Sequence, residues 1–384
     1  MAKTRDKILV IGKYYPPFNG GIELVTRQYA ERLSQRYEVD VLVSAHDKEC
    51  GTCEIGGVRV IRVPTQATLF SQPLSLGMLA QIRLRDYAAV QFHAPNPFVA
   101  SVLWAKMALD GFRTPLMIVH HMEISGRKAL RTLFAPLYRQ LARRAVWVSV
   151  TSPKNHAISQ DLPRDARVVT LPLFVDRTAY PHDAEFQAEA MHWRRQKYGE
   201  APLIGFVGRH AHYKGLDVLI RALAKLPEVR AVIAGEGAFR VRTMALAREL
   251  GIDDRVEFPG RLDHAEKCRL LAAIDVFAFP STGKTEAFGL SQLEAMLLGA
   301  VVVAIDLPTG VTDVAVHEET ALLAQPGDAD HLATQISRAL SDSELRSRLR
   351  SAAARHVEQR FSRERVLAEL EHLTGKAIGA VGTA

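Results

Sequence analysis

The part of this chain that most restricts its fold is the stretch 275–296, which reads DVFAFPSTGKTEAFGLSQLEAM. The apolar run Val276–Phe279 predicts a buried strand that ends at a proline, and a polar loop then leads to a helix that begins near Leu290. Backbone N–H groups at a helix start attract anions. Glu286 and Glu294 flank this start, and because carboxylates repel phosphate we interpret them as acceptors for hydroxyl groups. The stretch therefore predicts a ligand that carries both phosphate and sugar.

Length and composition restrict the class of protein. A chain of 384 residues is long enough for two domains, and 48% hydrophobic with 24% charged residues is typical of a soluble globular protein. No apolar run approaches the length of a membrane span, and the chain enters its first strand almost at once, so we expect neither a transmembrane helix nor a secretory signal. Three cysteines require no disulfide framework, which predicts a cytoplasmic protein.

Positive charge is concentrated in the first part of the chain. Residues 1–182 contain 24 lysines and arginines against 14 aspartates and glutamates, whereas residues 183–384 contain 25 against 28. A basic region can bind an anionic membrane, a phosphorylated substrate or nucleic acid. Because the sequence has no zinc finger, basic zipper or RNA-binding signature, nucleic acid is the least favoured partner.

Apolar runs alternate with amphipathic segments along the whole chain. They predict strands near 7–12, 38–44, 58–63, 88–93, 116–120, 146–151 and 168–172, and then near 204–207, 231–234, 256–258, 276–279, 300–304 and 321–324. This pattern predicts an α/β protein of two Rossmann-like, doubly wound domains that face a central cleft. We place the domains at 1–182 and 183–362, with a C-terminal helix, 363–384, that packs back on the first domain. Residues 176–202 lose the periodicity and read as a linker with at most one short helix.

Two cations follow a strand of the second domain, in the segment GFVGRHAHYKGLD. Arg209 and Lys214 flank a short loop before a helix, where they could clamp a diphosphate or remain solvated surface charges. In the first domain, Gly20 and Gly21 precede a helix, and they either allow a ligand to approach the backbone or simply form a tight turn. The glycines of the segment AGEG, 234–237, are a weaker signal of the same kind.

Histidines end two predicted strands of the first domain. His121, which Glu123 follows, could orient a sugar hydroxyl, act as a general base or be structural, and His93 is placed in a similar way. Cys50 and Cys53 form a CxxC, but without a second pair we expect an exposed hairpin tip rather than a zinc or redox site.

The segment 126–145 is basic and amphipathic, with Pro136 expected to kink or interrupt its helix. Such a segment either lies on an anionic membrane or packs its apolar stripe on the sheet. The sequence alone leaves both interpretations open.

Together these segments resemble family 4 of the retaining glycosyltransferases, which have the GT-B architecture. The resemblance covers nearly the whole chain, and the motifs occur in the order of the family. They are YYPPFNGGIE at 14–23, His121 with Glu123, Gly208-Arg209 and Lys214-Gly215, and two glutamates, Glu286 and Glu294, with seven residues between them in a segment that begins EAFGL. The chain departs from the family at Phe174, where a glycine is usual, and at Met122, where a small polar residue is usual.

The resemblance implies a role for each site residue. Glu286 would hold sugar hydroxyls, Glu294 the nucleotide ribose, and His121 would approach the transferred sugar. The diphosphate would meet Arg209, Lys214, Gly20, Gly21 and the backbone of Phe288, Gly289, Leu290 and Ser291. Members of the family retain the anomeric configuration and need no bound metal or other cofactor, which predicts front-face displacement in which the leaving phosphate takes the proton of the acceptor.

The expected donor is a nucleotide-sugar, GDP-mannose first and a UDP-sugar second. The expected acceptor is a free glycan or one linked to polyprenyl diphosphate in bacterial polysaccharide or O-antigen synthesis, since the segment LPTGV at 307–311 resembles such members. The basic first domain then predicts a peripheral position on the anionic inner face of the cell membrane. A sugar-nucleotide epimerase, a phosphorylase and a non-catalytic sugar-nucleotide-binding scaffold are the alternatives that we weighed.

Overall fold

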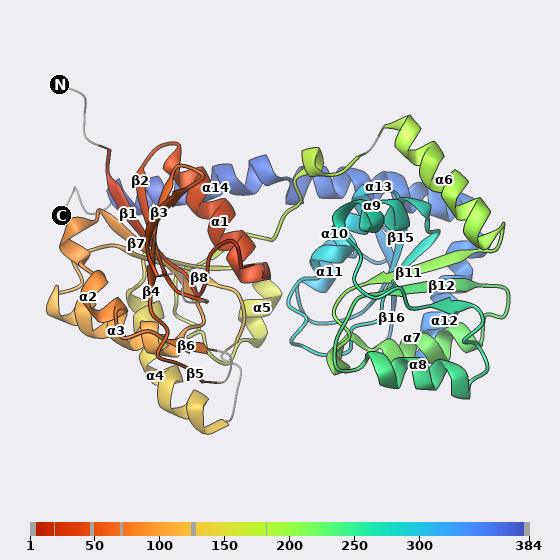
Figure 1. The fold of residues 1–384 in the computed structure, drawn as a ribbon, viewed down its shortest axis with the longest axis horizontal. Coiled ribbons are helices and arrows are strands. Elements are labelled where there is room, and N and C mark those ends of the chain that lie inside the picture. The colour runs from red at the N-terminus through yellow and green to blue at the C-terminus, as the bar shows by residue number, and fades with distance from the viewer. Residues whose placement is uncertain are drawn as a thin grey trace. The chain divides into compact units, whose positions relative to one another are not determined.

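The computed structural model (Figure 1) describes residues 5–18, 20–46, 50–69, 72–123, 128–181 and 183–379. The chain divides into two compact units. Unit 1 comprises Met1–Pro172 and Val366–Ala384, and unit 2 comprises Leu173–Arg365. The domain limits expected from the sequence, at 182 and 362, stay predictions.

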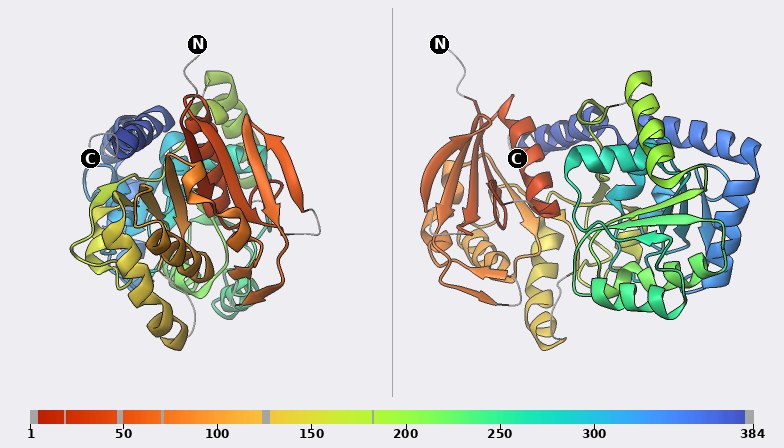
Figure 2. Two further views of the ribbon diagram at one scale, coloured as in Figure 1. Left: turned by 90° about the vertical axis from the view of Figure 1, so that its left-hand side faces the viewer. Right: turned by 45° about the vertical axis from the view of Figure 1, so that its right-hand side comes forward.

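Unit 1 is built on an eight-stranded sheet (Figure 2) in which all neighbours are parallel except the edge strand β3. Its strands, in spatial order, are β10 (Val168–Thr170), β9 (Trp147–Val150), β8 (Leu116–His120), β7 (Ala89–Ala94), β1 (Lys7–Ile11), β2 (Glu38–Ser44), β4 (Val58–Val63) and β3 (Gly51–Ile55). A small antiparallel pair, β5 (Ala67–Leu69) and β6 (Gln72–Leu74), lies apart from this sheet. The strand order reverses between β1 and β7, where a doubly wound sheet usually binds its ligand.

The helices of unit 1 connect the parallel strands. They are α1 (Gly21–Ser34), α2 (Met78–Gln81), α3 (Pro97–Leu109), α4 (Lys128–Arg144), α5 (Pro153–Ile158) and the short 3₁₀ turn η1 (Leu84–Asp86). The last helix of the chain, α14 (Arg363–Gly379), belongs to unit 1 from Val366 onward. Within the described part of the chain, no helix combines the length and the apolar character needed to cross a bilayer.

Unit 2 is built on a six-stranded parallel sheet. In spatial order its strands are β13 (Val256–Glu257), β12 (Arg230–Ala234), β11 (Leu203–Val207), β14 (Val276–Phe279), β15 (Val301–Ile305) and β16 (Ala321–Ala324). Its helical elements are α6 (Ala184–Tyr198), α7 (Leu216–Ala224), α8 (Arg240–Glu249), α9 (His264–Ala273), α10 (Leu290–Leu297), α11 (Val311–Val314), α12 (Ala329–Ser341), α13 (Ser343–Phe361), η2 (Arg177–Ala179) and η3 (His212–Lys214). Figure 1 shows α7, α8 and α12 on one face of the sheet and α9, α10 and α13 on the other. The strand order reverses between β11 and β14, so this pair marks the expected ligand edge.

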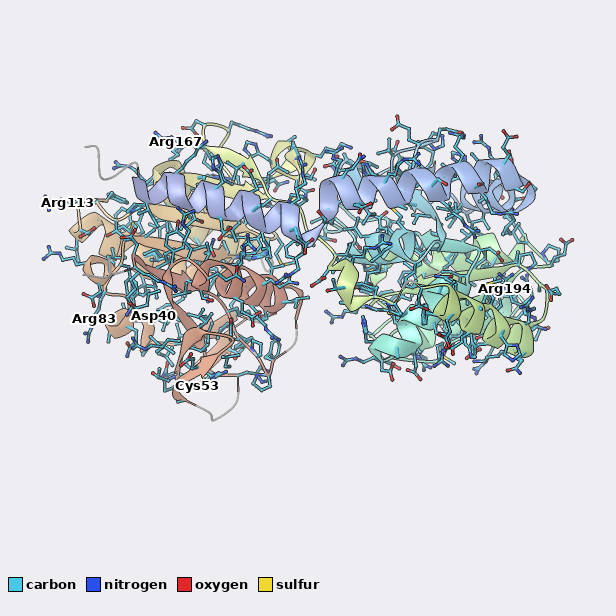
Figure 3. The ribbon with its side chains drawn as sticks, turned by 90° about the horizontal axis from the view of Figure 1, so that it is seen from above. Asp40, Cys53, Arg83, Arg113, Arg167 and Arg194 are labelled. Carbon is cyan, nitrogen blue, oxygen red and sulfur yellow. The ribbon has the colours of Figure 1, made fainter. Side chains whose placement is uncertain are left out.

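Helix α6 corrects the linker that the sequence predicted. It has 15 residues, begins at an Asp183 cap, and packs on α9 as part of unit 2. Its Arg194 (Figure 3) is buried, and the guanidinium donates to both carboxylate oxygens of Asp275, at 3.1 and 2.7 Å. The sequence allowed only a short helix here, because a buried arginine interrupts the apolar face that periodicity detects.

The structure shows where the two cysteines of the CxxC segment lie. Cys50 and Cys53 are exposed, but the turn of the β3–β4 hairpin is at Gly56 and Gly57, so the prediction of a hairpin tip is wrong. Among the residues that the structure describes, no three His, Cys, Asp or Glu side chains are grouped as metal ligands.

Helix α4 uses its arginines within unit 1. Arg131 bonds Asp161 at 2.9 Å, Arg139 donates to the carbonyl oxygen of Gln160 at 2.6 Å, and Arg143 bonds Asp165 at 3.0 Å. The helix continues through Pro136 without interruption. These contacts favour the packing interpretation of the basic segment over the membrane interpretation.

Candidate functional site

The predicted cation and carboxylate of unit 2 meet at the edge where its strand order reverses. Lys214 lies in the connection that follows β11, and Glu286 lies in the loop that follows β14. The Lys214 Nζ is 2.5 Å from the Glu286 Oε2, and the Ser281 hydroxyl donates to the same oxygen at 2.9 Å. Both residues of the pair are more than nine-tenths buried, with 9% and 8% of their surface exposed. Burial makes this a strong ion pair that depends on both of its partners.

Backbone contacts fix the two loops that carry the pair. The Thr282 N–H donates to the carbonyl oxygen of Tyr213 at 2.8 Å. Gly215 has φ 63°, and a Cβ at this position would lie 2.1 Å from the carbonyl oxygen of Pro280. The Lys214-Gly215 pair is therefore a unit in which the glycine lets the loops approach and the lysine bonds across them.

The start of helix α10 presents backbone groups rather than side chains. Its N-cap, Gly289, has φ 81° and no side chain caps the helix. The Gln292 N–H donates to the carbonyl oxygen of Gly289 at 3.0 Å, so the amides of Leu290 and Ser291 are the ones that can meet an anion. A Cβ at Gly289 would lie 2.5 Å from Cζ of Phe279. Phe288 is 2% exposed and packs edge-on against Phe361, and the Leu290 and Ser291 side chains are half-buried. Of Phe288, only the backbone can serve a ligand.

Glu294 is held by two residues that the sequence did not single out. Its Oε1 accepts from the Tyr180 hydroxyl and from the Lys267 ammonium, each at 2.6 Å. Burial, together with the neighbouring Glu294 carboxylate, raises the pKa of Tyr180, so this phenol remains a hydrogen-bond donor. Tyr180 lies in the segment predicted to be a linker, and Lys267 lies in an ordinary amphipathic helix. The sequence around them therefore does not mark either residue as a partner of Glu294.

Arg209 is exposed and has no ion pair with any side chain in the described ranges, which leaves its guanidinium available to a ligand at the end of β11.

The glycines of the AGEG segment, 234–237, are required by close backbone contacts that the sequence does not reveal. A Cβ at Gly235 would lie 1.8 Å from the carbonyl oxygen of Gly208, and one at Gly237 would lie 2.3 Å from that of His210. These glycines therefore hold the Arg209 turn in place by close backbone contact.

In unit 1, Gly20 and Gly21 begin helix α1 beside an open hollow of about 330 Å³. The hollow is lined by Pro16, Phe18, Gly20, Gly21, Glu23, Leu24 and Arg27. A Cβ at Gly20 would lie 2.2 Å from Oε2 of Glu23, whereas one at Gly21 would meet nothing within 4 Å. Close packing thus explains Gly20, and open space in front of Gly21 leaves its backbone accessible.

His121 pairs with His93 rather than with the acid that follows it. The Nε2 of His121 is 3.0 Å from the Nδ1 of His93, and the two rings are stacked. Glu123 instead accepts from the Ser159 hydroxyl at 2.5 Å and from the Gln160 and Asp161 N–H groups at 3.1 Å. Although burial alone would raise the pKa of Glu123, hydrogen bonds from His120 and Ser159 lower it to about 2. This carboxylate anchors the loop after β8.

Both histidines are neutral at ordinary pH. Burial lowers the pKa of His121 to about 3, and burial beside His121 holds the pKa of His93 well below 6.5. His121 is therefore suited to hydrogen bonding with a ligand and not to a base that titrates near neutrality.

This neutrality predicts acid-sensitive stability. Below pH 6.5 the unfolded chain takes up protons on these imidazoles that the folded chain does not, so stability falls as the pH falls from 6.5 toward 3. Each such histidine contributes a slope of up to about 1.4 kcal/mol per pH unit. Urea denaturation at pH 5.0 and 6.0 is expected to show a smaller slope for His121→Asn than for the native chain, and equal slopes would contradict the buried neutral state.

The predicted residues lie at helix starts and after strand ends in both units. Unit 2 brings Lys214 and Glu286 into contact, with the α10 start and Glu294 on the same loop-and-helix segment. Unit 1 places Gly21 at the start of α1 and His121 after β8.

Known proteins match both units. Residues 20–173 match the glycosyl transferase 4-like domain, and residues 187–356 match the glycosyl transferases group 1 family. The D-rhamnosyltransferase WbpZ of Pseudomonas aeruginosa is 32% identical over 315 residues, which are 80% of this chain and 79% of that protein. The O-antigen chain mannosyltransferase C of Escherichia coli is 27% identical over 92% of this chain and 94% of that protein. A GDP-mannose-dependent alpha-(1-6)-phosphatidylinositol monomannoside mannosyltransferase of Mycobacterium tuberculosis is 26% identical, covering 88% and 90%.

Solved structures share the fold of the whole chain. The sucrose-phosphate synthase of Thermosynechococcus elongatus superposes with a TM-score of 0.79 at 23% identity, covering 98% of this chain and 100% of that one. WaaG, a glycosyltransferase involved in lipopolysaccharide biosynthesis, superposes with a TM-score of 0.68 at 18% identity, covering 96% and 100%. The predicted GT-B fold of two Rossmann-like domains is confirmed. The chain belongs to family 4 of the glycosyltransferases, with a glycosyl transferase 4-like domain followed by a group 1 glycosyl transferase domain.

Proposed function

We propose that this glycosyltransferase transfers mannose from GDP-mannose to a glycan, free or linked to polyprenyl diphosphate, during synthesis of a cell-surface polysaccharide. The observation that carries the proposal is the buried Lys214–Glu286 pair at the reversal point of the unit 2 sheet. In this proposal Lys214 binds phosphate and Glu286 accepts from sugar hydroxyls, so their contact supports a sugar diphosphate as the ligand. Two relatives are named mannosyltransferases and a third transfers D-rhamnose, which is 6-deoxy-D-mannose, so their names favour a ring of the manno configuration.

In the proposed reaction, the bond between sugar C1 and the diphosphate oxygen breaks as the acceptor oxygen bonds to C1 on the same face. The acceptor hydroxyl proton passes to the leaving phosphate oxygen, and the anomeric configuration is retained. Lys214, Arg209 and the amides at the start of α10 stabilise the charge that develops on the diphosphate. These groups supply positive charge where a metal would otherwise be needed, so we propose metal-independent transfer.

The carboxylates are assigned to hydroxyl groups. Glu286 would accept from the transferred sugar, and Glu294, oriented by Tyr180 and Lys267, would accept from the ribose. By the family resemblance His121 would bond the transferred sugar, and Gly21, whose backbone is open, would meet the phosphates. We further propose a peripheral position on the cytoplasmic face of the membrane, which rests on the positive charge of residues 1–182 and not on α4.

The test is a donor panel of GDP-mannose, GDP-D-rhamnose, UDP-glucose and UDP-N-acetylglucosamine. We expect a GDP-sugar to raise the thermal midpoint most and to release GDP in the presence of a glycan acceptor. Preference for a UDP-sugar would overturn the donor assignment, and tight binding without release by any acceptor would favour the scaffold alternative. A chain that ignores anionic vesicles at low salt would contradict the membrane position alone.

A further inference from the structure

We propose that the buried His93 is a positioning residue, which fixes the ring orientation and the tautomer of His121. The proposal rests on the proposed function in one respect, the assignment of His121 to the transferred sugar. His93 itself is 1% exposed and cannot touch a ligand directly. Any effect on transfer must therefore pass through His121.

Three side chains surround the His93 ring with polar contacts. Its Nδ1 is 3.0 Å from the Thr26 hydroxyl on α1 and 3.0 Å from Nε2 of His121, which follows β8. Its Nε2 is 3.2 Å from Oε1 of Gln91, two residues earlier on β7. The edge of the Tyr29 ring packs against the imidazole, with 5.8 Å between the ring centroids. The ring is thus held on three sides by segments that meet where the unit 1 sheet reverses its strand order.

The hydrogen-bond directions follow from the partners. With the Gln91 amide oriented so that Oε1 faces the imidazole, Nε2 of His93 carries the proton and we assign Nδ1 as the acceptor. Two groups lie 3.0 Å from this Nδ1, the Thr26 hydroxyl and Nε2 of His121. Because the Thr26 hydroxyl donates to the carbonyl oxygen of Ile22 at 2.9 Å, we assign the Nε2–H of His121 as the donor to His93. His121 is then a neutral imidazole whose Nδ1 has an open lone pair, and this nitrogen has no partner within the ranges that the structure describes. An acceptor nitrogen of this kind is matched to a sugar hydroxyl that donates.

A purely structural histidine would be satisfied by Gln91, which shares its face of β7, and by Thr26. The third contact, at 3.0 Å, reaches Nε2 of His121, the residue assigned to the sugar. The backbone also ties the two segments, because the N–H of His121 donates to the carbonyl oxygen of Ala94 at 3.1 Å. The backbone hydrogen bond fixes the main chain of His121, and the contact with the His93 imidazole fixes the orientation of the His121 ring.

The experiment compares His93→Asn with His93→Leu in the full-length chain. The asparagine oxygen reaches the place of Nδ1 and preserves an acceptor for His121, whereas leucine removes it. We expect His93→Leu to lower kcat on the order of a hundredfold with little change in the KM for the donor, as small misplacements of a reacting group do. His93→Asn is expected to recover most of that loss.

Tautomers give a readout that needs no turnover. In protein labelled with ¹⁵N-histidine, the native His121 is expected to show the Nε2–H form, and His93→Leu a mixture of both forms. If His93→Leu fails to fold, Gln91→Met applies the same test, because loss of the acceptor frees the His93 tautomer. An unchanged His121 signal in the folded variants, or equal kcat values, would overturn the proposal. Absence of turnover by the native chain with every donor would instead overturn the proposed function and leave the tautomer test standing.

Discussion

Glu286→Gln is expected to lower kcat about a thousandfold while the chain stays folded, which is the size of effect seen when a preorganised polar contact to a transition state is lost. Glutamine keeps the shape of the side chain and can still accept from Ser281, but it cannot balance the Lys214 ammonium at 2.5 Å. The lysine then faces the diphosphate without its carboxylate partner. Donor affinity is therefore expected to hold or rise while kcat falls.

The measurement is steady-state release of nucleoside diphosphate together with direct titration of the donor. Glu257→Gln is the matched control, because Glu257 also pairs with a lysine of unit 2, Lys197, at 2.7 Å, but at the surface. We expect it to keep kcat within twofold of the native value, as surface pairs contribute little. A similar kcat for both variants would remove Glu286 from the reaction, and a loss of donor affinity with kcat unchanged would make it a binding residue only.

The fold was largely predictable because most strands are continuous apolar runs. The stretch Val276–Phe279 is a strand with the limits that its composition indicates. Strands β3, β5 and β6 were not predicted, and α6 was expected only as a short helix in a linker. Strand β3 is almost entirely exposed, so it has no apolar alternation, and α6 buries an arginine on its inner face. Periodicity detects burial of apolar residues, and it fails where an element packs through polar contacts.

The site was predictable in its residue types but not in its pairings. Lys214 and Glu286 were chosen for separate roles, yet 72 positions along the chain separate two residues that share a hydrogen bond. Tyr180 and Lys267 became visible only through the partners that the fold gives them, and His93, a candidate from its place at a strand end, gained its His121 contact in the same way. Spacing in a sequence reports neighbours on one element, and contacts between loops at the edge of a parallel sheet depend on strand order.

Arg194→Met is expected to lower the free energy of unfolding of unit 2 by about 3 kcal/mol, the lower end of the cost of breaking a buried ion pair. The guanidinium donates to both oxygens of Asp275 and to the carbonyl oxygens of Ala201 and Ala273, each at 3.1 Å or less. Methionine fills the space but leaves the Asp275 carboxylate with one remaining donor in this cluster, the Leu203 N–H at 2.9 Å.

Urea denaturation can isolate unit 2 by fluorescence, since the three tryptophans are Trp104 and Trp147 in unit 1 and Trp193 on α6. In a background with phenylalanine at the first two positions, Arg194→Met is compared with Arg195→Met, an exposed arginine on the same helix. We expect the control to change stability by less than about 0.5 kcal/mol. A loss below about 1 kcal/mol for Arg194→Met would mean that water replaces the guanidinium. Asp275 comes directly before β14, whereas the loop that carries Glu286 comes after this strand. We therefore expect Arg194→Met to leave the donor affinity of the folded protein unchanged. The Arg194–Asp275 pair then stabilises the strand and takes no part in donor binding.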